Sequence, residues 1–218
     1  MARQQLQTQG ARLPHGMARE LIVDAAEVLF SEANLETVSF RDLARKAGVS
    51  LSAIHYHFGS KEGVLAEIFA RHAAHLVERR VELLRAIPRS EDGALPLERI
   101  IDAFIRPAFE TTRGDRNDLF NRLLARLSIE PSDVVREIIS EAFDENDLLF
   151  IEEIRRAVAG LSRDDAHWRF HFLVGSMIYA MSGSGQLSGL SGGLCDVSNT
   201  DVAMAKMTSA FVALFEAP

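Results

Sequence analysis

The sequence contains a single cysteine, Cys195, which excludes an intrachain disulfide. A chain of this kind suits a reducing compartment, so we expect a cytoplasmic protein. No apolar run reaches the roughly 18–20 residues that a helix needs to cross a bilayer, and we therefore expect no membrane partner. Residues 1–16 lack the apolar stretch of a signal peptide and are expected to form a polar, disordered tail.

The chain also has few β-branched runs and little of the alternation that strands require. Hydrophobic residues make up 47% and charged residues 25% of the sequence, a balance typical of globular proteins. Ala, Leu, Glu and Arg, which favour helices, are the dominant residue types. We therefore predict an all-α fold of about nine helices.

Positive charge is in short supply, since the formal net charge is −7. Residues 1–63 hold seven Lys/Arg and seven Asp/Glu, so this segment is neutral and the acidic excess lies in residues 64–218. An acidic body repels phosphates, so any nucleic-acid contact is expected near the N-terminus.

Apolar residues recur at helical spacing along most of the chain. A Gly/Ser-rich loop is expected over 183–198, and the polar stretch 88–96 reads as a boundary between a small unit and a larger body. The periodicity predicts helices over residues 17–33, 40–47, 51–58, 61–88, 96–112, 116–129, 132–159, 162–182 and 199–215.

Residues 39–61 carry the clearest local pattern. Ser39 with Asp42 predicts a capped start for the helix over 40–47, and Gly48 is placed to end it with a positive φ. Ser50 is placed to cap the helix that follows. Two short helices joined by so tight a turn are typical of a helix-turn-helix, although two merely packed helices share the same spacing.

The residues favour the first of these interpretations. Residues 40–50 (FRDLARKAGVS) followed by 56–61 (YHFGSK) closely resemble the motif of the TetR/AcrR family, and the resemblance extends over residues 17–70. It implies a homodimeric regulator of transcription. Residues 17–63 would form a three-helix DNA-binding domain, and residues 64–218 a helical domain for effector binding and dimerisation.

The resemblance also implies which side chains contact double-stranded DNA. Helix N-termini favour phosphate, and the exposed side of the second short helix would enter the major groove. One position departs from the family pattern, because many members have Tyr where this chain has His55, whose charge can change near neutral pH. Arg3 and Arg12 would enter a minor groove or remain solvated. The implied contacts are Ser39, Arg41, Ser50, Leu51, Ser52, His55, Tyr56, His57 and Lys61.

The aromatic residues of the body are candidates for lining an effector pocket, although aromatic residues at such positions more often pack in the core. Residues 125–131, 168–175 and 190–195 are similar to regulators that respond to long-chain fatty acids or acyl-CoA. This similarity implies an apolar small-molecule effector, whose carboxylate or phosphate would meet Arg122 and Arg126 unless they form salt bridges instead. The candidate pocket residues are Phe104, Phe109, Phe120, Arg122, Arg126, Phe143, Phe150 and Phe172.

The helices predicted over 162–182 and 199–215 carry apolar residues around much of their circumference. Such a surface exceeds what one core needs and indicates a partner helix pair, as the resemblance also implies. The predicted homodimer interface contains Trp168, Met177, Ile178, Met181, Met207, Phe211 and Leu214.

Two other patterns suggest chemistry. His167 and His171 with Asp164 have a spacing that can bind zinc, but no third ligand is compelling, so no metal and no cofactor are predicted. Residues 189–193 (GLSGG) match the nucleophile-elbow pattern of hydrolases, which would use Ser191 with His167 or His171. That motif needs a preceding strand, whereas a helix is predicted here, so we expect no enzyme.

The sequence thus favours a ligand-responsive regulator, a repressor by family analogy, that binds a near-palindromic operator as a dimer and is released by a small apolar effector. Two alternatives remain. One is a hydrolase built on Ser191, and the other is a helical lipid-binding or adaptor module without DNA binding.

Overall fold

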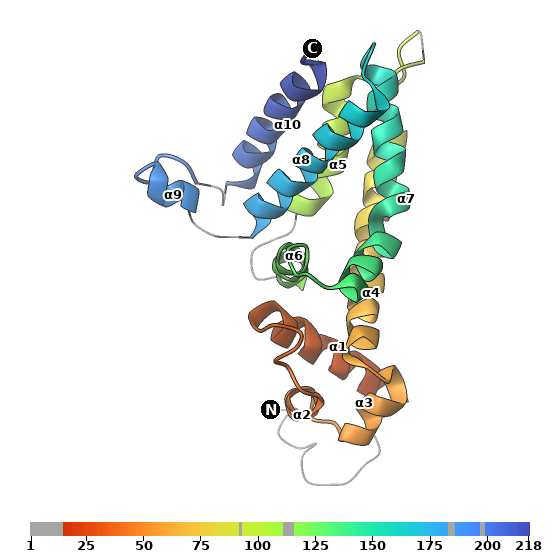
Figure 1. The fold of residues 1–218 in the computed structure, drawn as a ribbon, viewed down its shortest axis with the longest axis vertical. Coiled ribbons are helices and arrows are strands. Elements are labelled where there is room, and N and C mark those ends of the chain that lie inside the picture. Colours follow the sequence, from red (N-terminus) through yellow and green to blue (C-terminus); the bar gives the residue numbers. More distant parts are fainter. Residues whose placement is uncertain (1–14, 92, 111–115, 183–185, 197–198) are drawn as a thin grey trace. The chain divides into compact units, whose positions relative to one another are not determined.

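The fold was taken from a computed structural model, which describes residues 15–91, 93–110, 116–182, 186–196 and 199–218. These residues form helices and no strand, so the all-α prediction is confirmed (Figure 1). The helices are α1 (His15–Glu32), α2 (Phe40–Ala47), α3 (Leu51–Phe58), α4 (Lys61–Arg85), α5 (Leu97–Phe109), α6 (Arg116–Leu127), α7 (Asp133–Ala157), α8 (Arg163–Met181), α9 (Gln186–Leu190) and α10 (Thr200–Glu216).

Each of the nine predicted helices is present, and α2 and α3 have the predicted bounds. The prediction missed α9, which lies inside the expected loop 183–198. This helix has five residues, too few to show an apolar period, and it contains Gly189, which disfavours helix. Most of the predicted tail 1–16 lies outside the described residues. No described helix is both long enough and apolar enough to cross a membrane.

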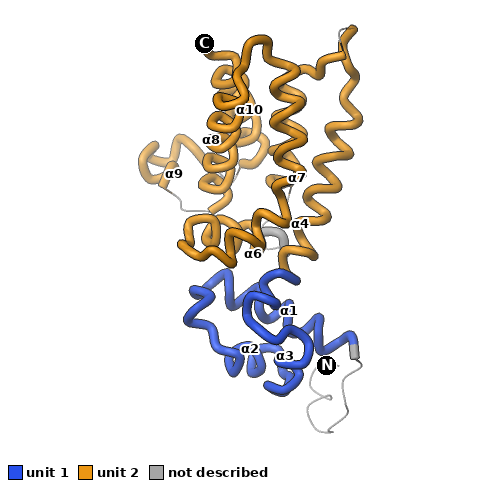
Figure 2. Tube along the Cα trace, turned by 45° about the vertical axis from the view of Figure 1, so that its right-hand side comes forward, with its two compact units in different colours: residues 1–67 blue, residues 68–218 orange. Residues whose placement is uncertain are grey.

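The chain divides into two compact units, Met1–Glu67 and Ile68–Pro218 (Figure 2). The division falls inside α4, so the prediction of a boundary at 88–96 is wrong. That stretch has the composition of a linker, yet its Leu95 is buried and joins Ile87 and Leu97 in the core of the second unit. Residues 88–96 are therefore a connection within one unit.

The first unit has a core of side chains from each of its helices. Ile22 and Phe30 of α1 are buried with Leu43 of α2 and Ile54 of α3, residues that recur at helical spacing. Ala44, Val49 and Phe58, on the same two helices and their turn, are only partly buried. The buried residues fix α2 and α3 against α1 and leave the remaining sides of both short helices exposed.

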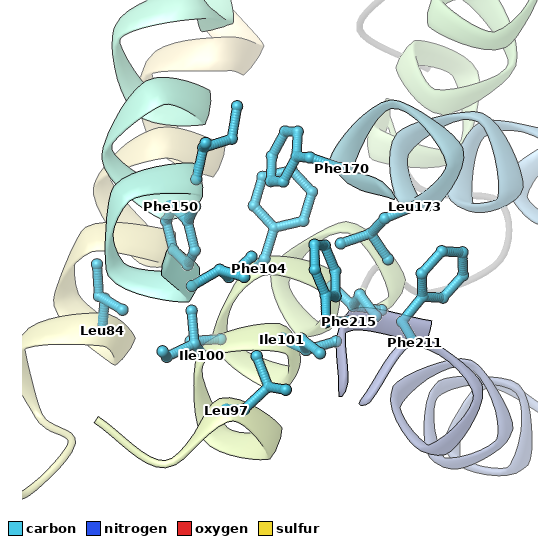
Figure 3. Packing of buried hydrophobic residues seen from close by; sticks show 14 of the residues in the cluster. Leu84, Leu97, Ile100, Ile101, Phe104, Phe150, Phe170, Leu173, Phe211 and Phe215 are labelled. Atoms are coloured by element: carbon cyan, nitrogen blue, oxygen red, sulfur yellow. The ribbon is translucent and has the colours of Figure 1, made fainter. Parts of the chain in front are cut away.

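The core of the second unit is a cluster supplied mainly by α5, α7, α8 and α10. At its centre the Phe104 ring lies 5.1 Å from that of Phe150 and 4.9 Å from that of Phe170, centroid to centroid (Figure 3). Full burial of such a side chain stabilises a fold by about 1.5–3 kcal/mol, so this cluster fixes the helices around it.

Candidate DNA interface and effector cavity

Both short helices begin with a side-chain cap, and the cap of α2 is reciprocal. At the start of α2, the Ser39 N–H donates to Asp42 Oδ2 at 3.1 Å and the Asp42 N–H donates to Ser39 Oγ at 3.2 Å. The hydrogen bonds from Ser39, strengthened by Arg45, lower the pKa of Asp42. Gly48 ends α2 with φ +69, and Ser50 Oγ accepts from the Ala53 N–H at the start of α3. The predicted caps are therefore present, and they fix the turn between the helices.

One side of α3 presents polar and aromatic groups to solvent. Tyr56 is 70% exposed and Leu51 39% exposed, and Ser50, Ser52 and His55 are exposed as well. Arg41 of α2 is exposed too, whereas His57 is partly buried. The His55 ring lies 4.8 Å from the Phe40 ring in an edge-on contact. This contact fixes the ring at the position where the family pattern has a tyrosine.

Lys61 is engaged within the first unit. Its Nζ donates to the Leu35 carbonyl oxygen at 2.6 Å and to the Glu36 carbonyl oxygen at 3.2 Å. The side chain thus ties the start of α4 to the loop between α1 and α2. Lys61 remains at a helix N-terminus, but its ammonium also has a structural task that the sequence did not indicate.

The second unit contains a cavity of about 750 Å³ that is partly open to solvent. Its walls come from α4 to α8 and are mostly apolar, with Leu76, Phe143, Val174 and Ile178 among them. Gly175 of α8 faces open space, since no atom lies within 4 Å of where a Cβ would stand. A cavity of this size and character suits a small organic molecule.

Arg80 brings a buried positive charge to the cavity wall, with only 2% of the residue exposed. Its Nε donates to the Phe104 carbonyl oxygen at 2.9 Å, and its Cζ lies 3.8 Å from the centroid of the Phe104 ring. Burial lowers the pKa of Arg80 to about 10. The guanidinium is therefore largely removed from water and held by α5.

Asp147 of α7 supplies the opposite charge. Its Oδ1 lies 3.9 Å from Arg80 Nη1 and accepts a hydrogen bond from Asn146 Nδ2 at 3.1 Å. Burial raises the pKa of Asp147, although the nearby Arg80 opposes the shift. Asp144, one turn earlier on α7, also lines the cavity. The cavity thus combines mostly apolar walls with two arginines, Arg80 and Arg136, and three carboxylates, Glu130, Asp144 and Asp147.

Only two of the eight predicted pocket residues line this cavity, namely Phe104 and Phe143. Phe150 belongs to the core, and Phe172 is 51% exposed. The side chains of Phe109, Arg122 and Arg126 are not among the lining groups. Phe120 instead lines a second hollow of about 270 Å³, where its ring stacks on His72 at 4.8 Å between centroids.

Arg80 and Asp147 were not predicted, although the sequence carries a signal for both. Each is a charged residue inside an apolar stripe of helical spacing, where a buried and functional group is expected. The stripe on α4 is Phe69, Ala73, Leu76, Arg80 and Leu84, and the stripe on α7 is Phe143, Asp147, Ile151 and Ile154.

The helices α8 and α10 share an exposed apolar surface. Trp168 is 56%, Phe172 51% and Tyr179 55% exposed on α8, and Val202 is 50% exposed on α10. Arg169 joins the two helices, since its Nη1 donates to the carbonyl oxygens of Leu214, Phe215 and Ala217. Two residues expected at the dimer interface, Met177 and Phe211, are instead buried in the protomer core at 3% and 8% exposed.

The two other patterns noted in the sequence have local roles. His167 Nδ1 bonds the Arg163 carbonyl oxygen at 2.6 Å, and no group of three His, Cys, Asp or Glu suited to a metal occurs among the described residues. Ser191 Oγ donates to the Ser188 carbonyl oxygen at 3.3 Å and accepts from the Cys195 N–H at 2.9 Å. The hydroxyl of Ser191 thus closes a turn that follows the short helix α9.

A capped helix-turn-helix in one unit and an apolar cavity in the other define the class of ligand-sensing bacterial regulators. Two family models match the chain. The model described as "Bacterial regulatory proteins, tetR family" covers residues 22–68. The model described as "Tetracyclin repressor-like, C-terminal domain" covers residues 102–213, about half of the chain. The chain belongs to the TetR family of bacterial transcriptional regulators, as the motif over residues 17–70 predicted.

Curated relatives are similar over part of their length. The chain is 26% identical over 106 residues to the HTH-type transcriptional regulator AcrR of Shigella flexneri, covering 49% of this chain and 47% of that protein. It is 32% identical over 90 residues to the HTH-type nicotine-responsive transcriptional repressor HdnoR of Paenarthrobacter nicotinovorans, covering 39% and 43%. The match thus spans a little under half the length of these relatives.

Solved structures are similar over nearly the whole chain. The fatty acid degradation regulator FadR from Bacillus halodurans superposes with a TM-score of 0.63 at 16% identity, over 96% of this chain and 97% of that one. At 16% identity this similarity shows a shared fold, and it covers both units of the chain.

Proposed function

We propose that this protein is a ligand-responsive transcriptional repressor that binds a near-palindromic operator as a homodimer. Residues 17–63 act as the DNA-binding domain, and residues 64–218 bind the effector and the second protomer. The observation that carries the proposal is the exposed side of α3, which presents polar and aromatic groups on a turn fixed by caps at both helices. A short helix of this form fits the major groove.

In this proposal the contacts with DNA divide into two kinds. Phosphate contacts set affinity and register, and base contacts set the sequence that is read. Lys61 contributes chiefly by positioning, because its ammonium holds the loop before α2 through Leu35 and Glu36. Phosphate contacts are assigned to Ser39, Arg41, Tyr56 and His57, and base contacts to Ser50, Leu51, Ser52 and His55.

The effector is proposed to be a small molecule with a large apolar part, because the cavity of about 750 Å³ has mostly apolar walls. The names of two relatives point to small organic molecules, nicotine for one repressor and fatty acids for one structural neighbour. A long-chain fatty acid or acyl-CoA remains one candidate. The arginines expected to anchor its acidic end, Arg122 and Arg126, are absent from the described cavity wall.

Effector binding is proposed to reach the DNA-binding domain through α4. This helix begins at Lys61 in the first unit, and its Leu76 and Arg80 line the cavity in the second. A ligand releases DNA only if it binds more tightly to a conformation in which the two recognition helices are wrongly spaced. A ligand that moves Leu76 or Arg80 acts on the same helix whose first turns, from Lys61 to Glu67, belong to the first unit.

The dimer is proposed to form through α8 and α10. Exposed apolar side chains on one helix face indicate a partner surface, and a two-fold dimer repeats the same face on both protomers. Trp168 and Phe172 are the central contacts, with their ring centroids 5.9 Å apart. Partly buried residues of the same two helices, namely Ile178, Met181, Met207 and Leu214, complete the interface.

The test is fluorescence anisotropy of the purified protein on the duplex upstream of its own gene, with a titration of salt. Binding that weakens steeply with salt, and that exceeds binding to a random duplex, is expected. Tyr56→Ala is expected to weaken binding about tenfold, a loss of about 1.4 kcal/mol. Leu148→Ala, at an exposed position of α7 outside the cavity wall, is expected to leave binding unchanged.

The second candidate is a helical lipid-binding or adaptor module without DNA binding. The cavity and the acidic body favour it, because neither feature requires DNA. Delipidated protein that fails to bind a pool of random duplexes, and that still binds apolar ligands, would establish this candidate and exclude the repressor.

A further inference from the structure

We propose that the effector ends in an uncharged group that both accepts and donates a hydrogen bond, such as a hydroxyl or an amide, held between Arg80 and Asp147. This inference rests on the proposed function, because it names the chemistry of the ligand for the same cavity. The proposed end group is neutral, whereas the end group of a fatty acid is acidic.

The distance between the two charged groups leaves room for one ligand atom. Arg80 Nη1 and Asp147 Oδ1 are 3.9 Å apart, which is too long for a hydrogen bond. Two hydrogen bonds of about 2.8 Å can meet at one oxygen across such a gap. A hydroxyl placed there accepts from Nη1 and donates to Oδ1. Oδ1 accepts one bond from Asn146 and has capacity for one more.

A charged end group meets repulsion in this place. A carboxylate placed between the two groups would bind Arg80 but would lie against Asp147, with Asp144 one turn away on the same cavity wall. The other arginine of the wall, Arg136, already pairs with Asp133. An ammonium would bind Asp147 but would lie against Arg80, which is buried and already stacked on Phe104. Like charges in a partly desolvated site are costly, so a neutral donor–acceptor group is preferred over both.

The surroundings of the pair add to this preference. Burial lowers the pKa of Arg80 and raises that of Asp147, so both charged forms lack the solvation they would have in water. Hydrogen bonds from a ligand supply part of what burial removes. The pair therefore gives a polar anchor to a molecule that otherwise contacts apolar walls.

The apolar walls beside Arg80 and Asp147 indicate the chemistry of the rest of the ligand. Phe143, Val174 and Ile178 line the cavity, and the open space beside Gly175 admits bulk. Apolar walls reward burial of hydrocarbon at about 25 cal/mol per Å². The structure thus points to a neutral amphiphile, a long or ring-containing apolar body with one hydroxyl or amide end.

The experiment compares three ligands that share one apolar body, namely decanol, decanoate and decylammonium, each below its micelle concentration. Isothermal titration calorimetry on the full-length protein without DNA measures the three affinities. Decanol is expected to bind at least about tenfold more tightly than either ion, a difference of about 1.4 kcal/mol. Equal or tighter binding of decanoate would overturn the proposal in favour of an acidic effector, and failure of all three to bind would overturn it as well.

Single substitutions should change which end group is preferred. Asp147→Asn keeps the shape of the side chain and leaves Arg80 as the cation, so decanoate is expected to bind more tightly than in the wild type. Arg80→Gln removes the cation that faces Asp147, so decylammonium is expected to bind more tightly than in the wild type. Glu141→Gln removes an exposed charge of α7 outside the cavity wall and should change none of the three affinities. An unchanged ranking in correctly folded Asp147→Asn would contradict the assignment.

Failure of the proposed function and failure of this inference give different experimental results. DNA binding is measured separately by anisotropy, on the same protein with and without each ligand. The expected ranking of ligands without any DNA binding would sustain this inference and remove the repressor. Specific DNA binding released best by decanoate would sustain the repressor and remove this inference.

Discussion

The guanidinium of Arg80 lies over the ring of Phe104, with 3.8 Å between Cζ and the ring centroid, and its Nε also donates to the Phe104 carbonyl oxygen. One side chain thus joins α4 to α5 by two different contacts. Both depend on the planar guanidinium, because an ammonium can neither stack nor donate from the Nε position. Arg80 is therefore more than a countercharge for Asp147.

Arg80→Lys is expected to destabilise the second unit by about 1–3 kcal/mol, through loss of the stacking and of the buried hydrogen bond. Trp168 is the single tryptophan and lies on α8, so its fluorescence reports this unit during urea unfolding. The neighbouring Arg79→Lys provides the control, because Arg79 has 43% of its side chain exposed. Equal midpoints for the two variants would show that the contacts with Phe104 contribute little.

Gly175 offers a direct test of the cavity. Gly175 lines the cavity and is exposed on α8, so Gly175→Leu adds a side chain at the cavity wall without striking another atom at Cβ. The variant is expected to bind a neutral apolar dye such as N-phenyl-1-naphthylamine at least about tenfold more weakly, because the space is occupied. Dye fluorescence in a titration of protein measures this affinity.

Gly175→Ala is the matched control. It adds one methyl group, so it is expected to retain dye binding and to raise the stability of α8 by about 0.5–1 kcal/mol, since alanine favours helix over glycine. Wild-type affinity for the dye in Gly175→Leu would mean that the dye binds elsewhere, and the assigned cavity would be rejected.

The helices and the DNA-binding unit could be predicted from sequence because their signals are local. Ser39, Gly48 and Ser50 specify the ends of α2 and α3 through neighbouring backbone groups, and the apolar period specifies the long helices. The family motif depends on the same contiguous residues. Accordingly the bounds of α2 and α3 agree with the prediction at both ends.

The cavity could not be predicted in the same way, because it depends on which helices meet. Phe104 and Phe150 look alike in the sequence and both belong to the core, yet only Phe104 also lines the cavity. Met177 likewise belongs to an apolar face but is turned into its own protomer. Arg80 and Asp147 each give a local signal in the sequence, namely a charge within an apolar stripe. That the two side chains lie close together could not be predicted, because it depends on how α4 and α7 pack in three dimensions.

The cap at Ser39 has a consequence that depends on pH. Hydrogen bonds from Ser39 lower the pKa of Asp42 in the folded protein. Their stabilisation of α2 is therefore fully present above the unfolded pKa of about 3.9, and it is lost as the pH falls through the lower folded pKa. Ser39→Ala is expected to raise the pKa of Asp42 toward its ordinary value, as measured by NMR titration of the carboxyl carbon.

A second cap of the same type provides the control for this titration. Ser162 Oγ accepts from the Asp165 N–H at 3.0 Å at the start of α8. Ser162→Ala should leave the titration of Asp42 as it is in the wild type. An unchanged pKa of Asp42 in Ser39→Ala would mean that the backbone N–H of residue 39 and Arg45, rather than the Ser39 hydroxyl, hold the carboxylate in its charged form.

The exposed rings of Trp168 and Phe172 yield a prediction about assembly. Phe172→Glu places a charge at the proposed two-fold interface and is expected to weaken the dimer at least about tenfold, because each dimer would bury two such charges. Sedimentation velocity over a range of protein concentrations measures the shift toward monomer. Leu148→Glu on α7 is the control, because Leu148 is exposed to a similar extent, 54% against 51%. If Leu148→Glu alone dissociated the protein, the interface would lie on α7 and not on α8 and α10.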